Sequence, residues 1–373
     1  MRSVLMSRQC GRASASLLLL LMVVLYFLLT PNLRLPFLEN TLEPRGGQQI
    51  QEEINIILVI CRSNSKNLLN SIDRQLLQAS VAIKAAAYLS LQRIRFLIVS
   101  DSQDVFNELV ALTQAWPTAY KERISFKFVA SWYPPEHEDM RGLFRPCASQ
   151  RLFLLRLLPE ESAVLYMDSD VIFLRPPEEL WKIFNEFNEE QFAAAAAING
   201  PYNHIPKEVR YSDVGFNAGL MLYNLTRMRQ FPAGWEDQVL NITAEYRSIF
   251  LYGDQDILNI FFGKFRSHFH ALGCEWNLRP AYCQLHFIHT CPTLMRAGGK
   301  IVHGVSGSFY TPGKFMAFFK SWEALNMTQP LAGFQAELRK NLAAATQKDV
   351  RKCREREYVD RILSQQLISG NNN

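Results

Sequence analysis

Two acidic side chains stand at the end of a strongly apolar segment near the middle of this chain. Asp168 and Asp170, separated by Ser169, interrupt the apolar run of residues 163–174. Such a run is typical of a fully buried strand, and open α/β sheets bind ligands at the carboxyl ends of their strands. In an extended segment, side chains two residues apart point to the same side, and two convergent carboxylates are costly without a cation between them. We therefore expect a hard divalent ion here that also holds the phosphate oxygens of a diphosphate ligand.

An isolated Asp-x-Asp pair is weak evidence, because a turn with two solvated aspartates gives the same pattern. The apolar residues on both sides of the pair argue against a solvent-exposed turn. The pair gains weight from His303, which follows a short apolar strand and precedes Gly304 and Gly307. A lone histidine is more often structural than a ligand, but two carboxylates and one imidazole suit Mn²⁺. The two glycines would leave backbone N–H groups free to face phosphates.

Two further segments carry polar groups beside small residues. The stretch Gly215-Phe-Asn-Ala-Gly places Asn217 at a strand start, with Ala218 and Gly219 allowing a ligand near the backbone. In Gly253-Asp-Gln-Asp, Asp254 can cap a helix, whereas Gln255 has no helix-starting role and can present its amide to a ligand.

Arg151 lies on the helix expected just before the Asp168 strand. A planar, permanently charged group there suits a diphosphate or the metal-binding carboxylates, and the alternative is an exposed helix arginine such as Arg156.

These motifs together resemble glycosyltransferase family 8 over roughly residues 54–325. The matching segments are Tyr166-Met-Asp-Ser-Asp-Val-Ile-Phe-Leu-Arg-Pro, Phe216-Asn-Ala-Gly, Gly253-Asp-Gln-Asp-Ile-Leu-Asn and Val302-His-Gly. Three others look like the glucoside xylosyltransferases within that family: Gly142-Leu-Phe-Arg-Pro-Cys-Ala-Ser-Gln-Arg-Leu-Phe-Leu, Leu225-Thr-Arg-Met-Arg and Cys274-Glu-Trp-Asn-Leu-Arg-Pro-Ala-Tyr-Cys.

The resemblance implies a GT-A fold and a retaining, Mn²⁺-dependent transfer of xylose from UDP-xylose. The implied acceptor is an O-linked glucose on EGF-like repeats, such as those of Notch, which is extended by an α1,3 bond. The metal ligands would be Asp168, Asp170 and His303. The donor would be contacted by Arg151, Ser169, Asn217, Ala218, Gly219, Asp254, Gln255, Gly304 and Gly307, with Asp254 and Gln255 in catalytic roles.

Two positions depart from the family pattern. Many family 8 members carry a lysine six residues after the metal-binding histidine, and here that residue is Phe309, so the phosphate contact must be absent or come from elsewhere. Ala218 stands where close relatives often carry serine. Because an amide such as Gln255 is a poor nucleophile, we expect the acceptor to attack on the same face as the leaving UDP.

The surrounding sequence alternates between strands and helices. Strands are expected at residues 54–60, 94–99, 124–129, 163–174, 192–198 and 215–224, and helices at 67–91, 105–115, 148–158 and 178–187. This order predicts a single, mainly parallel, doubly wound sheet. We expect the GT-A domain at residues 52–330 and a charged helical extension at 331–373.

The amino terminus predicts membrane attachment. A basic tail at residues 1–12 precedes an apolar stretch at 13–30, close to the ~20 residues that span a bilayer. The charge asymmetry keeps the tail cytosolic. We therefore expect a single-pass type II anchor, a stem at 31–51 and a lumenal domain in the ER or Golgi; a cleaved signal peptide is the alternative.

A lumenal domain gives meaning to sequons and cysteines. Asn224, Asn241 and Asn326 begin Asn-x-Thr acceptors, of which Asn224 is the most buried by pattern. Among seven cysteines, Cys283 and Cys291 close a short loop and are the disulfide candidates, although Cys274 is near and the pairing is open. A zinc site is the competing interpretation, but Cys-x8-Cys-x7-Cys fits no compact ligand spacing.

Composition and motif order narrow the alternatives. The net charge is only +5, and no basic-aromatic pattern supports nucleic-acid binding. Aspartate phosphatases place Asp-x-Asp on the first core strand, whereas here three strands precede it. Two alternatives stay open: the same fold with another UDP-hexose or UDP-glucuronate donor, and a catalytically silent lumenal sugar-binding protein.

Overall fold

The computed structural model describes residues 53–62, 71–145, 147–198, 200–283, 290–345, 356–365 and 367. All of them belong to one compact unit, Ile50–Asn373. The predicted tail, anchor and stem at residues 1–51 lie outside the described residues. Among the described residues, no helix combines the length and apolar character needed to cross a membrane.

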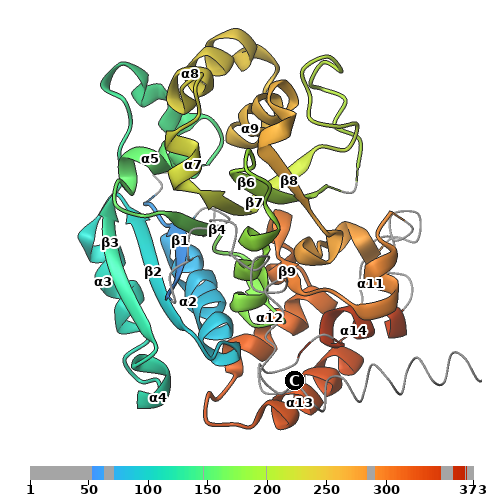
Figure 1. Cartoon of the computed structure of the whole chain (residues 1–373). Helices are drawn as coiled ribbons and strands as arrows, with labels where there is room; N and C mark the ends of the chain where they lie inside the picture. Colours follow the sequence, from blue (N-terminus) through green and yellow to red (C-terminus); the bar gives the residue numbers. More distant parts are fainter. Residues whose placement is uncertain are drawn as a thin grey trace, which may run out of the picture. The chain divides into compact units, whose positions relative to one another are not determined.

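The unit is built around a seven-stranded sheet in the order β3-β2-β1-β4-β7-β6-β8 (Figure 1). Its strands are β1 (Glu53–Val59), β2 (Arg93–Ser100), β3 (Ile124–Ala130), β4 (Ala163–Met167), β6 (Ala193–Ala197), β7 (Phe216–Asn224) and β8 (Phe269–Leu272). Four neighbouring pairs are parallel, and β7 alone runs antiparallel to both of its neighbours, β4 and β6. The prediction of a mainly parallel sheet is confirmed.

The prediction of a single sheet is wrong. The apolar run of residues 163–174 divides into β4 and a separate strand β5 (Val171–Phe173), which pairs antiparallel with β9 (Ile301–His303). The chain turns between β4 and β5, where Val171 N donates to Asp168 O at 3.2 Å. The two carboxylates are therefore carried by a turn between two sheets.

Helices cover both faces of the large sheet, as the doubly wound pattern predicts. Alternate β1 side chains enter different cores: Ile56 packs in the cluster with α2, α3 and α12–α14, and Ile57 in the cluster with α7–α9. The helices are α2 (Ile72–Leu89), α3 (Gln103–Ala111), α4 (Thr118–Lys121), α5 (Leu154–Leu157), α6 (Pro177–Trp181), α7 (Leu225–Arg229), α8 (Trp235–Tyr246), α9 (Asp254–Lys264), α11 (Pro292–Ala297), α12 (Lys314–Ala324), α13 (Leu331–Ala344) and α14 (Arg356–Ser364).

The helix expected at residues 148–158 is not continuous. It consists of a 3₁₀ segment, Ala148–Phe153, followed by the short helix α5. Hydrogen bonds from side chains hold the 3₁₀ segment against the rest of the fold: Ser149 Oγ donates to Met140 O at 2.7 Å, and Gln150 Nε2 donates to Trp132 O at 2.7 Å. These tertiary bonds fix the direction of Arg151.

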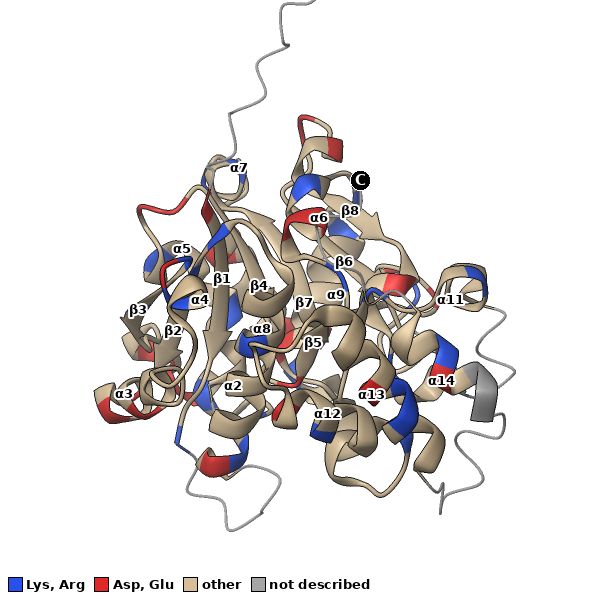
Figure 2. Ribbon diagram, turned by 90° about the horizontal axis from the view of Figure 1, so that it is seen from below, with Lys and Arg blue, Asp and Glu red and all other residues tan. Residues whose placement is uncertain are grey.

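The predicted C-terminal extension packs on the domain. Phe334 of α13 lies 4.7 Å, centroid to centroid, from Trp322 of α12, and both are buried. Lys314 is buried and pairs with Asp360 of α14 at 2.8 Å. Figure 2 shows basic and acidic residues along α13 and α14, and Glu337, Arg339 and Lys340 of α13 are exposed. The extension thus combines a charged surface with an apolar face that joins the main core.

Two disulfides cross-link the part of the domain that the structure describes. Cys61, just after β1, pairs with Cys147, and Cys274 pairs with Cys291. A disulfide in the Cys274–Cys291 region is therefore confirmed, but the predicted Cys283–Cys291 pair is wrong. Cys274 and Cys291 have Cα atoms 5.9 Å apart, a separation suited to a disulfide, although 17 positions separate them in sequence.

The two cross-links are expected to differ in their effect on stability. Replacing Cys61 and Cys147 together by alanine should lower the free energy of unfolding by about 2–4 kcal/mol. Replacing Cys274 and Cys291 should cost about 1.4 kcal/mol less, because the sequence separation is 17 instead of 86 and the loop-closure entropy is smaller. Urea unfolding of both variants and of the wild type checks this order. A larger loss from the shorter loop would contradict it.

Candidate active site

The metal-ligand cluster predicted from the sequence is assembled in the structure. The ligand atoms of Asp168, Asp170 and His303 all lie within 4.8 Å of one another. His303 Nε2 is 3.2 Å from Asp170 Oδ1 and 3.9 Å from Asp168 Oδ2. The small β5–β9 sheet produces this arrangement, because Val171 is in register with His303 and places Asp170 beside it.

The neighbour Asn277 determines which ring nitrogen of His303 donates a hydrogen bond. His303 Nδ1 lies 3.0 Å from Asn277 Oδ1, and a carbonyl oxygen can only accept, so Nδ1 carries the proton. The other nitrogen, Nε2, then faces two carboxylates and needs a positive partner, either a proton or a metal ion. Partners of this kind usually fix the tautomer of a metal-binding histidine.

The two carboxylate oxygens of Asp168 have different partners. Its Oδ1 accepts hydrogen bonds from Tyr166 Oη and from the Arg151 guanidinium, both at 3.0 Å. Its Oδ2 is the oxygen that faces His303. One carboxylate oxygen is thus held by the protein while the other points to the proposed metal position.

Arg151 links Asp168 to the second acidic group, Asp254. Its Nε lies 2.8 Å from Asp254 Oδ2, its guanidinium also donates to Ala218 O, and its Cζ lies 4.2 Å from the Tyr166 ring centroid. Burial alone would lower the pKa of Arg151, but the two carboxylates outweigh burial and raise it. Arg151 is therefore a buried, permanent cation rather than the exposed helix arginine of the alternative interpretation.

Burial and charge act in opposite directions on Asp170. Burial alone would raise its pKa, but His303, together with Arg145 and Arg74, lowers it below the ordinary value. Its carboxylate is ionised at neutral pH, which is the form that binds a cation.

A chain of amide side chains connects His303 to Gln255. Asn277 Nδ2 donates to Asn217 Oδ1 at 3.0 Å, and Asn217 Nδ2 donates to Gln255 Oε1 at 2.9 Å. Gln255 Oε1 also accepts from Ala218 N at 3.1 Å, so two protein donors occupy this oxygen. The side chains of residues 217 and 255, which sequence motifs singled out separately, therefore meet in one network with the cluster.

The absence of a side chain at Gly219 leaves space beside the cluster. A Cβ atom there would lie 2.7 Å from Asp168 Oδ2 and 2.9 Å from His303 Nε2, closer than real Cβ contacts allow. The space beside the cluster exists only because residue 219 is glycine. Two carboxylates, an imidazole lone pair and this open space fit a divalent ion such as Mn²⁺.

The structure also places the remaining predicted donor-binding residues. Ser169 is half-buried in the turn between the two aspartates, and Ala218 is buried with both backbone groups bonded. Gly304 N donates to Asp170 O at 2.7 Å, so the prediction that this N–H faces a phosphate is wrong: the turn uses it internally. Gly307 is buried and has φ +74°, a conformation that suits glycine.

The capping role expected of Asp254 is also wrong. Gly253 is the N-cap of α9, and the Asp254 carboxylate pairs with Arg151 instead. Asp256 binds the preceding turn, because its Oδ2 accepts from Leu251 N and Tyr252 N, both at 2.6 Å.

Two supporting residues were not assigned a role from the sequence. Asn277 orients His303, and Tyr166 holds Asp168. Both lie inside motifs that resemble the family, namely Cys274-Glu-Trp-Asn-Leu-Arg-Pro and Tyr166-Met-Asp-Ser-Asp. For Asn277 the motif position was the only signal, because 26 positions separate it from His303, whereas Tyr166 stands two residues before Asp168, a spacing that puts both side chains on the same side of an extended segment.

The hydrogen bond between Asn277 and His303 leads to a testable prediction. Asn277→Ala removes the acceptor that fixes the His303 tautomer and should weaken Mn²⁺ affinity by roughly 10- to 100-fold. Isothermal titration with Mn²⁺ measures the effect, with Asn188→Ala, an exposed asparagine, as the control. Unchanged Mn²⁺ affinity in the Asn277 variant would show that the hydrogen bond from His303 to Asn277 does not orient His303 for metal binding.

The three sequons differ in their surroundings. Asn224 caps α7, because its Oδ1 accepts from Arg227 N at 3.0 Å. Asn241 is exposed on α8, and Asn326 is exposed in the loop after α12, where its Oδ1 accepts from Thr328 N at 3.1 Å. Glycosylation at these residues stays a prediction.

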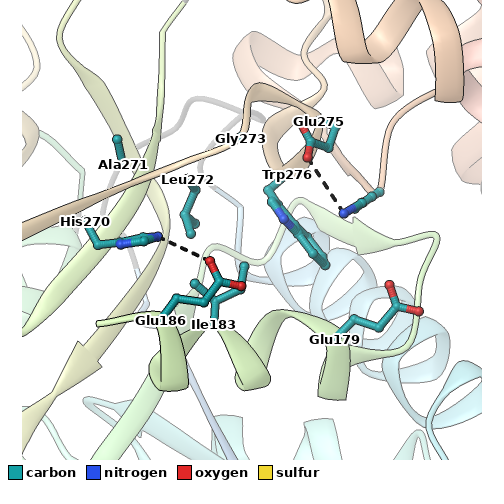
Figure 3. A pocket seen from close by; sticks show the side chains of 10 residues that line it. Glu179, Ile183, Glu186, His270, Ala271, Leu272, Gly273, Glu275 and Trp276 are labelled. Carbon is teal, nitrogen blue, oxygen red and sulfur yellow. Dashed lines mark ion pairs between the residues drawn. The ribbon is translucent and has the colours of Figure 1, made fainter. Parts of the chain in front are cut away.

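A separate recess of about 280 Å³ is lined by α6, by β8 and by the segments that follow these two elements, with Lys300 beside them (Figure 3). Its lining residues are Glu179, Ile183, Glu186, His270, Ala271, Leu272, Gly273, Glu275, Trp276 and Lys300. His270 Nε2 and Glu186 face each other across it at 3.8 Å. None of the predicted site residues lines this recess.

Comparisons with known proteins place the fold and motifs in one family. The family model described as glycosyl transferase family 8 matches residues 67–297. Glucoside xylosyltransferase 2 of Mus musculus is 34% identical over 245 residues, covering 62% of this chain and 54% of the relative. Glucoside xylosyltransferase 1 of Danio rerio is 33% identical over 266 residues, covering 67% and 65%. The chain therefore spans about half to two thirds of the length of these curated relatives.

Solved structures share the same fold at lower identity. The apo form of mouse xyloside xylosyltransferase 1 has a TM-score of 0.51 and 19% identity, covering 68% of this chain and 98% of that structure. The galactosyltransferase LgtC, in complex with donor and acceptor sugar analogs, has a TM-score of 0.53 and 18% identity, covering 75% and 100%. These likenesses show a GT-A-like α/β fold. Because the family model covers more than half of the residues, this chain belongs to glycosyltransferase family 8.

Proposed function

We propose that this protein is a retaining glycosyltransferase that transfers xylose from UDP-xylose, in α1,3 linkage, to O-linked glucose on EGF-like repeats of Notch-type proteins. The observation that carries the proposal is the cluster of Asp168, Asp170 and His303 next to the Arg151–Asp254 pair. The relatives named glucoside xylosyltransferase support the choice of sugars.

Mn²⁺ is the proposed cofactor, held by Asp168, Asp170 and His303. When bound, the metal neutralises charge on the diphosphate of the donor and of the departing UDP. Neighbouring side chains hold the proposed ligands in place before the donor binds. Arg151 and Tyr166 fix Asp168, and Asn277 fixes His303, so the ligands need little rearrangement when the donor binds.

The arrangement around Gln255 supports the same-face mechanism. Two protein donors already bind Gln255 Oε1, so this oxygen is not available to attack the sugar. In the proposed step, the bond between the anomeric carbon and the UDP oxygen breaks as the acceptor hydroxyl oxygen bonds to that carbon on the same face. The hydroxyl proton passes to the departing phosphate oxygen. Gln255 and Asp254 are then positioning groups near the sugar.

The proposed location is the lumen of the ER or Golgi, with a type II anchor at residues 13–30. The two disulfides, Cys61–Cys147 and Cys274–Cys291, support an oxidising compartment. A protease-protection assay on intact microsomes tests the topology with antibodies against each end of the chain. A C-terminal domain digested without detergent would contradict the proposed orientation.

A donor screen tests the proposed function. We expect hydrolysis of UDP-xylose with Mn²⁺, loss of turnover with EDTA and recovery when Mn²⁺ is added back. UDP-glucose, UDP-galactose and UDP-glucuronate should react more slowly. Transfer to an O-glucosylated EGF-like repeat, followed by NMR of the new linkage, should give an α anomer. Faster use of another donor would reassign the sugar, and no turnover with any donor would favour a silent binding protein.

A further inference from the structure

Phe309 occupies the position where many family 8 members carry a phosphate-binding lysine. Its side chain is fully buried and stacks on Phe319, with ring centroids 4.9 Å apart. Phe309 also covers Gly304, where a Cβ atom would lie 2.7 Å from the Phe309 ring at Cγ. This position belongs to the apolar core in this chain and supplies no charge to a diphosphate.

The permanent cation already described at the site is engaged by carboxylates. Arg151 lies between Asp168 and Asp254, at 3.0 and 2.8 Å, so two negative groups already balance its charge. A diphosphate bound beside Asp168 and Asp170 would add further negative charge. A second cation near the cluster is therefore expected if the donor is a nucleoside diphosphate sugar.

Arg74 brings a guanidinium to the residue next to Phe309. It lies in the first turn of α2, where Ser71 caps the helix and accepts from Arg74 N. Its Cζ lies 4.4 Å from the ring centroid of Tyr310, which directly follows Phe309. A planar guanidinium stacked on an aromatic ring has fewer free rotamers and can still donate from its edge.

The helix that carries Arg74 also packs next to the metal-ligand cluster, because α2 contacts β5, and β5 begins directly after Asp170. Arg145, the other arginine named above with Asp170, has an exposed side chain whose Cζ lies 5.6 Å from the Phe144 ring centroid. Of these two cations, Arg74 is the one that is partly buried and stacked beside position 309.

We propose that Arg74, delivered from α2 and stacked on Tyr310, binds the donor diphosphate in place of the lysine that Phe309 replaces. This proposal rests on the proposed UDP-sugar function. It assigns the diphosphate contact to a residue of α2, far in sequence from position 309. A guanidinium can donate two parallel hydrogen bonds to phosphate oxygens, which a lysine cannot do.

Nucleotide binding by the full-length protein in Mn²⁺ tests the assignment. Arg74→Ala should weaken UDP binding by roughly 10- to 100-fold, the range for a lost hydrogen bond to a charged group. Arg74→Lys should recover part of that loss, because the charge remains and the second donor is lost. Uridine, which has no phosphate, should bind the wild type and both variants within about twofold. Isothermal titration measures UDP, and NMR titration measures the weaker uridine.

Matched variants separate a phosphate contact from a packing effect. Arg156→Ala removes an exposed arginine that pairs with Glu236 and should leave UDP affinity unchanged. Equal losses for UDP and uridine would assign Arg74 a structural role and overturn the proposal, as would wild-type UDP affinity in Arg74→Ala. If the wild type binds no UDP in Mn²⁺, the proposed function fails and this assignment fails with it.

Discussion

Asp170→Asn is expected to abolish Mn²⁺-dependent turnover, with a loss of at least roughly 1,000-fold. Such a loss corresponds to about 4 kcal/mol of transition-state stabilisation. Asparagine has nearly the same shape but presents a neutral oxygen, so the site loses one of its two anionic ligands. The remaining groups, Asp168 and His303, keep their supports from Arg151, Tyr166 and Asn277.

The Asp170→Asn protein should still fold. The backbone carbonyl of residue 170 accepts from Gly304 N, and this bond does not depend on the side chain. Thermal unfolding with and without Mn²⁺ measures both properties: the metal-free melting temperature should change little, and the rise on adding Mn²⁺ should disappear. Asp213→Asn, which alters an exposed carboxylate, should retain the rise. Near-wild-type turnover in Asp170→Asn would refute the metal assignment.

The strands could be predicted from sequence because the sheet is buried on both faces. Residues 54–60 and 94–99 are almost continuously apolar, and they appear as β1 and β2 with only small changes at the ends. The direction of β7 could not be predicted in this way. Its residues are buried like those of a parallel strand, and composition does not encode whether a strand runs with or against its neighbours.

The cluster of Asp168, Asp170 and His303 could be predicted because ionisable residues are rare in apolar surroundings. Asp170 and His303 each end or begin a buried strand, where an ionisable side chain needs a functional reason. The amide chain through residues 217, 255 and 277 could not be predicted, because amides are common and these three come from β7, α9 and the segment after β8. The Cys274–Cys291 pairing could not be predicted either, because sequence spacing does not give the distance between two cysteines in the folded chain.

Gly219→Ala is expected to disrupt the metal site while all three ligands remain in the chain. The added Cβ would lie 2.7 Å from Asp168 Oδ2 and 2.9 Å from His303 Nε2. His303 has little freedom to retreat, because Asn277 holds its ring and its backbone is paired in β9. We expect Mn²⁺ affinity and turnover to fall by at least roughly 100-fold, and the overpacking to cost about 1–3 kcal/mol of stability.

The comparison with Asp170→Asn distinguishes charge from geometry. Gly219→Ala keeps both carboxylates and the imidazole, so a loss of Mn²⁺ binding would come only from the space that the methyl group occupies. Gly200→Ala is the matched control, because a Cβ there meets no atom within 4 Å, and it should bind Mn²⁺ like the wild type. Isothermal titration with Mn²⁺ measures all three variants. Full Mn²⁺ affinity in Gly219→Ala would place the metal away from the Asp168–His303 gap, even if Asp170→Asn were inactive.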